Sequence, residues 1–173
     1  MDILLNIYKY YAQCNKAINV NMLKILKENA GIYNRKISGY YKSVNDILFH
    51  ILDVDLSWMS DLKDVIHSKI FEEEIFLHFN ANIEPVNQYK DINEFEKDRI
   101  ILDALIIKFI DNLDIEDLQK KLVYKNNKIK RVWEILIHTF NHQTHHRGQI
   151  SEILDGNMIE NDFSNMIRYE IMK

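Results

Sequence analysis

Apolar residues recur every three or four positions along most of this chain, the spacing that places side chains on one face of an α-helix. The 173 residues include four glycines and one proline, so few positions interrupt long regular elements. Ser43 is a good helix N-cap, and Gly156-Asn157 is a good C-cap pair. The pattern predicts four long helices, at about 3–26, 43–62, 91–113 and 131–157.

The segments between these helices are shorter and less regular. Residues 122–124 and 129–131 flank two asparagines and resemble the strands of a small hairpin. We interpret residues 68–90 as a connection that contains one short helix, and we expect a further short helix at about 162–171. Four long helices, with a short hairpin before the last, favour an all-α antiparallel four-helix bundle formed by residues 1–173 as a single domain.

The charge balance and the single cysteine exclude several classes of protein. The net charge is −4, so the chain lacks the basic surface that nucleic-acid binding usually requires, and we interpret the basic run 120–131 as a solvated hairpin. Cys14 has no partner for an intramolecular disulfide or a cysteine-based zinc site. No apolar run approaches the ~20 residues that span a bilayer, and the N-terminus lacks signal-peptide features. We therefore expect a soluble, cytoplasmic protein without nucleic-acid or membrane partners.

Histidines cluster in the predicted fourth helix, within residues 138–150. Four of the seven histidines lie there, and His138, His142 and His146 are spaced four residues apart. On a helix this spacing stacks the rings on one side, where neighbouring imidazoles can bind a metal ion. His138 lies at the margin of the inward-facing stripe, and His145 turns further away. The His142/His146 pair has the i, i+4 spacing of helical zinc sites, so we predict that both are metal ligands.

Two histidines alone bind a metal weakly, so a third ligand must come from another helix. His50 is the best candidate, because it lies among the apolar residues of the predicted second helix. A single buried histidine is more often an ordinary core residue, but the histidine pair on the facing helix reverses that balance. Three protein ligands with one open position are typical of a catalytic metal site. Imidazole suits several divalent transition metals, of which we place zinc and nickel first.

Other chemistries found in helical bundles lack their motifs here. The sequence contains no Glu-x-x-His repeat of a di-iron centre, no His-Glu-x-x-His of a zinc protease and no phosphate-binding glycine motif. Asp46 and Asp53 lie one helical turn from His50, where they either orient its ring or are solvated. Gly148 lies inside the predicted fourth helix at a cost of ~1 kcal/mol relative to alanine, which we attribute to a closely packed neighbouring helix.

The histidine segments carry a resemblance to a known family. Residues 141–149, with the sequence Asn-His-Gln-Thr-His-His-Arg-Gly-Gln, resemble the C-terminal signature of the DinB family (DinB/YfiT-like). Residues 50–58 are similar to the first histidine motif of that family, and residues 133–138 and 162–169 fit its flanking pattern. The resemblance therefore covers most of the chain.

The resemblance implies a four-helix bundle, frequently homodimeric, in which three histidines bind a metal; here they are His50, His142 and His146. Some members of the family are thiol-dependent transferases or isomerases that use low-molecular-weight thiols such as bacillithiol or mycothiol. After Gly156 the chain departs from the family's usual proline-containing turn, because residues 157–160 are Asn-Met-Ile-Glu.

Two classes of function follow as hypotheses. The first is a metal-dependent enzyme, a thiol S-transferase or a hydrolase, in which the metal activates a thiol cofactor or water for attack on a small electrophilic substrate. The second is a non-catalytic metal-binding bundle, in which a fourth ligand, His138 or a carboxylate, closes a structural site; a stress-response interaction module is a weaker third hypothesis. The residues expected to support the metal or to line its pocket are Tyr11, His138, Asn141, His145 and Gln149.

Overall fold

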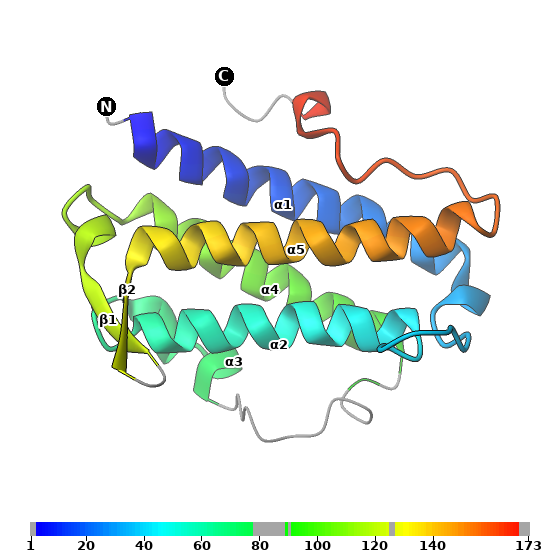
Figure 1. Ribbon diagram of the computed structural model, residues 1–173, viewed down its shortest axis with the longest axis horizontal. Coiled ribbons are helices and arrows are strands. Elements are labelled where there is room, and N and C mark those ends of the chain that lie inside the picture. Colours follow the sequence, from blue (N-terminus) through cyan, green and yellow to red (C-terminus); the bar gives the residue numbers. More distant parts are fainter. Residues whose placement is uncertain (1–2, 78–88, 90, 125–126, 170–173) are drawn as a thin grey trace.

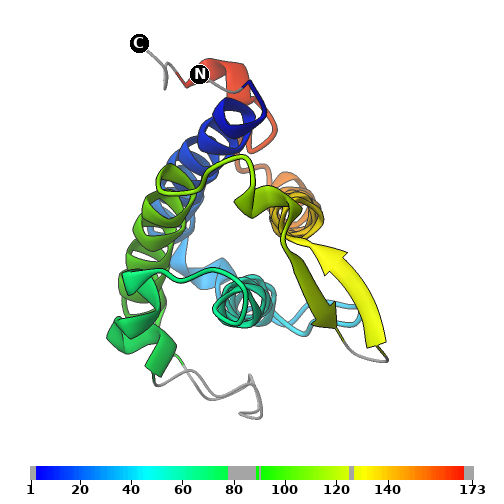
Figure 2. The ribbon, with the colours of Figure 1, turned by 90° about the vertical axis from the view of Figure 1, so that its left-hand side faces the viewer.

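Four long helices form most of the computed structural model, which describes residues 3–77, 89, 91–124 and 127–169 (Figure 1). They are α1 (Ile3–Glu28), α2 (Val44–Leu62), α4 (Ile92–Asp111) and α5 (Val132–Asp155). Helices α1 and α5 run in one direction, and α2 and α4 run in the other (Figure 1). The most extensive contacts join α1 to α4 and α2 to α5, so each of these pairs is antiparallel. Figure 2, which looks nearly along α2 and α5, shows the four helices around a common core. The predicted all-α bundle is confirmed.

Local capping interactions set where the long helices begin. Ser43 Oγ accepts a hydrogen bond from the backbone N–H of Asp46 at 3.1 Å, at the start of α2. Asp91 caps α4 in the same way through its carboxylate. Glu134 Oε2 accepts a hydrogen bond from the backbone N–H of Arg131 at 2.8 Å, at the start of α5. The observed ends of the four helices lie within two residues of the predicted ones.

The connection between α2 and α4 has to span the length of the bundle, which explains why it contains many residues. These two helices run in the same direction, so the end of one and the start of the next lie at opposite ends of the molecule (Figure 1). The described part of the connection contains the 3-10 helix η2 (Lys69–Glu72) and the one-turn helix α3 (Glu74–Leu77). The remainder of the predicted connection, residues 78–88 and 90, lies outside the described residues.

The predicted hairpin is confirmed at one end of the bundle. Strands β1 (Lys121–Tyr124) and β2 (Lys128–Arg131) pair antiparallel, with Leu122 opposite Lys130. The ring of Tyr124 lies 4.7 Å from that of Trp58, measured between centroids, so the hairpin packs against α2. Two further 3-10 helices, η1 (Ala30–Ile32) and η4 (Asp117–Gln119), follow α1 and precede β1.

The prediction of a helix at 162–171 is wrong over the residues that the structure describes. This segment is irregular apart from the 3-10 turn η6 (Met166–Arg168). The carbonyl oxygen of Met166 accepts hydrogen bonds from Tyr10 Oη at 3.0 Å and from Cys14 Sγ at 3.8 Å, while Phe163 is buried. The same carbonyl accepts the backbone N–H of Tyr169 at 3.2 Å, so the segment is closed by one 3-10 turn and held against α1 by side-chain hydrogen bonds. Residues 170 and 171 lie outside the described residues.

The apolar core fills the space between the four helices, and it also encloses a buried arginine. On α4 the apolar residue Ile100 is 43% exposed. Arg99, the preceding residue, takes the inward position and is 1% exposed, because two carboxylates inside the bundle bind its guanidinium. None of the described helices has both the length and the hydropathy of a membrane span.

Candidate metal centre

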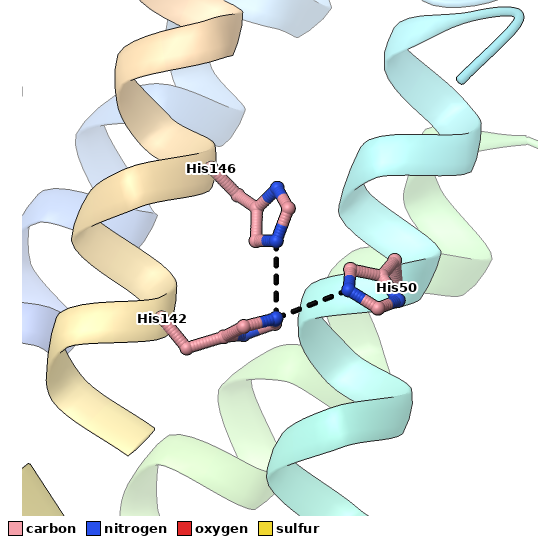
Figure 3. Close-up of side chains that lie close together, drawn as sticks. All are labelled: His50, His142 and His146. Carbon is pink, nitrogen blue, oxygen red and sulfur yellow. Dashed lines mark hydrogen bonds between the residues drawn. The ribbon is translucent and has the colours of Figure 1, made fainter. Parts of the chain in front are cut away.

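Three histidine side chains converge between α2 and α5 (Figure 3). His50 extends from α2, and His142 and His146 extend from successive turns of α5. His142 Nε2 lies 3.0 Å from His50 Nε2 and 3.0 Å from His146 Nε2. One ring nitrogen from each histidine falls within 4.8 Å of the others. The three residues proposed as ligands from the sequence are thus brought together by the packing of α5 on α2.

The spacing and chemistry of these nitrogens fit a transition-metal ion. Zinc–imidazole bonds of 2.0–2.1 Å in a tetrahedron place neighbouring nitrogens ~3.3 Å apart, so a small separation of the rings admits the ion. Gln149 Oε1 lies 2.8 Å from His146 Nδ1 and can act only as an acceptor, so that ring nitrogen carries the proton. The lone pair of His146 is therefore on Nε2, which faces the other two histidines.

The electrostatics of the site favour neutral imidazoles. Burial lowers the pKa of His50 to about 4, and the neighbouring His146 adds to the shift. Burial, followed by the charges that His146 and His50 would carry, lowers the pKa of His142 to about 3. The pKa of His146 is also lowered, mainly by burial. At neutral pH a metal ion therefore meets three neutral imidazoles and not imidazolium ions.

The other histidines of α5 lie beside the three converging rings. His138 is exposed, and its ring packs 5.3 Å from Trp58 and 5.9 Å from His142, measured between centroids. His145 is also exposed, with its ring 4.8 Å from that of His146. Neither belongs to the group of described residues whose ligand atoms converge.

Two residues predicted to line the pocket are not brought to the histidines. The Tyr11 ring stacks on Phe140 at 5.5 Å, where α1 meets α5, and Asn141 is exposed. In the part of the chain that the structure describes, no hydrogen bond or ring contact joins either side chain to His50, His142 or His146. Gln149, in contrast, contacts His146 directly.

Tyr41 is a component of the site that the sequence patterns missed. Its ring lies 5.3 Å from that of His50 and 5.5 Å from that of His146. Tyr41 and Gln149 also line a cavity of about 470 Å³ between α5 and the segment before α2, together with Ile37, Tyr40, Ile47 and Ile153. Tyr41 precedes α2, so helical periodicity gave no signal for it. Tyr41 and Gln149 therefore both contact the histidines and line the cavity.

The expectation for Gly148 is wrong. A Cβ atom at this position would meet no heavy atom within 4 Å, so no closely packed helix requires a glycine there. The residue is exposed on α5.

Comparison with known proteins identifies the family. Residues 1–156 match the model of the DinB family, a range that contains the four long helices and the three histidines. The chain is similar to Protein DinB of Bacillus subtilis (strain 168), with 27% identity over 157 residues that cover 88% of this chain and 85% of that protein. No solved structure matches the chain significantly. Because the family model spans most of its length and both histidine-bearing helices, this chain belongs to the DinB family.

Proposed function

We propose that the protein is a metal-dependent enzyme whose His50, His142 and His146 hold a divalent transition metal, zinc or nickel foremost, with one coordination position left for a reactant. The main observation in support is that one nitrogen from each of the three histidines lies within 4.8 Å of the others. No fourth ligand from the described residues joins this group. A metal held in this way is a Lewis acid that lowers the pKa of a thiol or water at its remaining position.

The surrounding side chains support a small-molecule substrate. The cavity of about 470 Å³ has the size of a small-ligand site, and it reaches the histidines through Tyr41 and Gln149. Gln149 orients the His146 ring by accepting a hydrogen bond from its Nδ1–H group. The Tyr41 ring contacts the rings of His50 and His146. In the proposed reaction a thiol or water would lose its proton to solvent and bond to an electrophilic carbon of the substrate. The leaving group would depart with the electrons of the bond that breaks.

The structural-metal hypothesis needs a fourth protein ligand, for which His138 or a carboxylate was the candidate. Among the described residues, no carboxylate joins the three converging histidines. The His138 ring instead packs on Trp58 and is exposed, which supports the open site and hence the enzyme. The activity remains a thiol S-transferase or a hydrolase, according to whether a thiol cofactor or water takes the open position.

The proposal is tested by metal analysis of untagged protein and three alanine variants. We expect about one ion per chain in the unmodified protein and in His145→Ala, whose exposed ring lies beside the site. We expect loss of the ion in His50→Ala and His142→Ala, because two imidazoles bind a metal weakly. An unchanged metal content in both variants would contradict the assignment of His50 and His142 as ligands. The loaded protein is then assayed with bacillithiol, mycothiol and water against small electrophiles, and conjugates or hydrolysis products that depend on His142 identify the reaction.

A further inference from the structure

A network of buried polar side chains joins all four long helices. Each of its six main members is at most 4% exposed. They are Asn19 on α1, Asp55 on α2, Arg99 and Asp103 on α4, and Gln143 and Arg147 on α5. Arg99 binds both carboxylates, with Nη1 2.6 Å from Asp55 Oδ2 and Nη2 2.6 Å from Asp103 Oδ1.

Gln143 connects α5 to both α1 and α2, whereas Arg147 connects α5 to α1 alone by donating a hydrogen bond from Nη1 to Asn19 Oδ1 at 3.4 Å. Gln143 Nε2 donates a hydrogen bond to Asp55 Oδ2 at 2.9 Å, which joins α5 to α2. Its Oε1 accepts hydrogen bonds from Asn19 Nδ2 at 3.3 Å and from Arg147 Nη1 at 3.1 Å. The Nε2 and Oε1 atoms of this amide are thereby held by three hydrogen-bond partners.

The Gln143–Asp55 hydrogen bond lies close to the metal centre along both helices. Gln143 directly follows His142, and Asp55 follows His50 by five residues. Helices α2 and α5 are therefore joined at two neighbouring levels, by the histidine contacts and by the Gln143–Asp55 hydrogen bond. Ligands from separate helices bind a metal well only when they are held within ~0.5 Å of the required geometry.

Stability alone does not account for this buried network. A buried ion pair gains little over well-packed apolar side chains, because both charges lose their hydration. The cost is visible at Asp55, where burial raises the pKa to about 7 despite the contact with Arg99. The best-attested benefit of buried polar contacts is a fixed register between helices, since a shifted helix leaves the polar groups unpaired.

We infer that Gln143 is a positioning residue: its hydrogen bond to Asp55 fixes the register of α5 on α2, and thereby the geometry in which His50 and His142 meet the metal. The inference rests on the proposed metal site. It assigns to the Gln143–Asp55 hydrogen bond a role in metal affinity that is separable from the role of the whole network in folding.

The test compares Gln143→Leu with Asn19→Leu in titrations with Co²⁺ and Zn²⁺. Both variants remove a buried amide from the network, but only Gln143→Leu removes the bond between α2 and α5. We expect Gln143→Leu to bind Zn²⁺ about tenfold more weakly, the lower end of the loss seen when a supporting contact of a metal site is removed. Its Co²⁺ absorption bands, which report coordination geometry, should shift as well. Asn19→Leu should retain the affinity and the spectrum of the unmodified protein even where its melting temperature is lower.

A second variant keeps the test decisive if Gln143→Leu does not fold. Gln143→Glu places two carboxylates in contact in place of the hydrogen bond to Asp55 and should weaken metal binding.

The outcomes separate this inference from the proposed function. Unmodified protein that binds neither Co²⁺ nor Zn²⁺ overturns the metal site and the positioning role together. Metal binding by the unmodified protein, with affinity and spectrum unchanged in folded Gln143→Leu or Gln143→Glu, overturns the positioning role alone.

Discussion

At the scale of single residues, Gln149 connects the three histidines to the neighbouring cavity. Its Oε1 accepts a hydrogen bond from His146 Nδ1 at 2.8 Å. Together with Tyr41, it also lines the cavity. We expect Gln149→Leu to weaken metal binding about tenfold, because the His146 ring loses the acceptor that fixes its tautomer. Competition with a chelator measures the change. Asn141→Ala, a change at an exposed position of the same helix, should have no effect, and equal affinities in the two variants would contradict the role of Gln149.

The metal-free histidines make the stability of the protein depend on pH. In the folded chain the pKa values of His50 and His142 are about 4 and 3, whereas both lie near 6.5 in the unfolded chain. Between pH 6.5 and 4 the unfolded chain therefore takes up protons that the folded chain does not. The free energy of unfolding is expected to fall as the pH is lowered through this window. Urea titrations of metal-free protein at pH 7, 6 and 5 measure the fall.

Asp55 contributes to the same pH window with the opposite sign. Burial raises its folded-state pKa to about 7 from the ordinary value of 3.8, so the folded chain holds a proton that the unfolded chain releases. Its contribution is present at low pH and is lost as the pH rises towards 7. His142→Leu should therefore flatten the pH dependence, and Asp55→Asn should steepen it. Slopes that do not change in these directions would contradict the assignment.

At the scale of elements, capping residues and apolar periodicity were enough to place the helices that carry the ligands. Ser43 and the inward stripe of α2 fixed where His50 lies, and the i, i+4 spacing on α5 paired His142 with His146. Periodicity has no meaning outside a regular element. Tyr41, in the segment before α2, was therefore missed although its ring contacts two of the histidines. For the same reason the irregular C-terminal segment was mistaken for a helix.

Gly148 is a position where α5 can be made more stable. It lies within the helix and is exposed, and a Cβ atom added there would have no heavy atom within 4 Å. Gly148→Ala is expected to raise the free energy of unfolding by about 0.5–1 kcal/mol, because alanine loses less backbone entropy on folding. Urea denaturation measures the gain. Gly39→Ala is the matched control: its φ of 127° strains any other residue, so that variant should lose about 1–3 kcal/mol. A loss of stability in Gly148→Ala would show that the glycine has a partner or a function of its own.

At the scale of the whole molecule, the buried network could not be predicted from the sequence. Charged residues are almost never fully buried unless they are paired, so pattern analysis assigns them to the surface. Arg99 and Asp55 are far apart in the chain, and nothing in their local sequence pairs them. On the same helix the apolar neighbour Ile100 is 43% exposed while the charged Arg99 is 1% exposed, the reverse of what residue type alone predicts. The pairing arises only when α2 and α4 pack on the other two helices, which is a property of the assembled bundle.

Arg99 is expected to matter more for the stability of the whole bundle than any ion pair at its surface. Arg99→Met leaves Asp55 and Asp103 buried without their cation, a situation that typically costs about 3–5 kcal/mol. Lys27→Met is the control, because Lys27 also joins two helices through a short contact, 2.8 Å to Glu96, but at the surface. Solvent screening limits that loss to about 1 kcal/mol or less. Thermal and urea unfolding of the two variants measure the difference, and losses of equal size would mean that the buried carboxylates regain protons or hydration once Arg99 is removed.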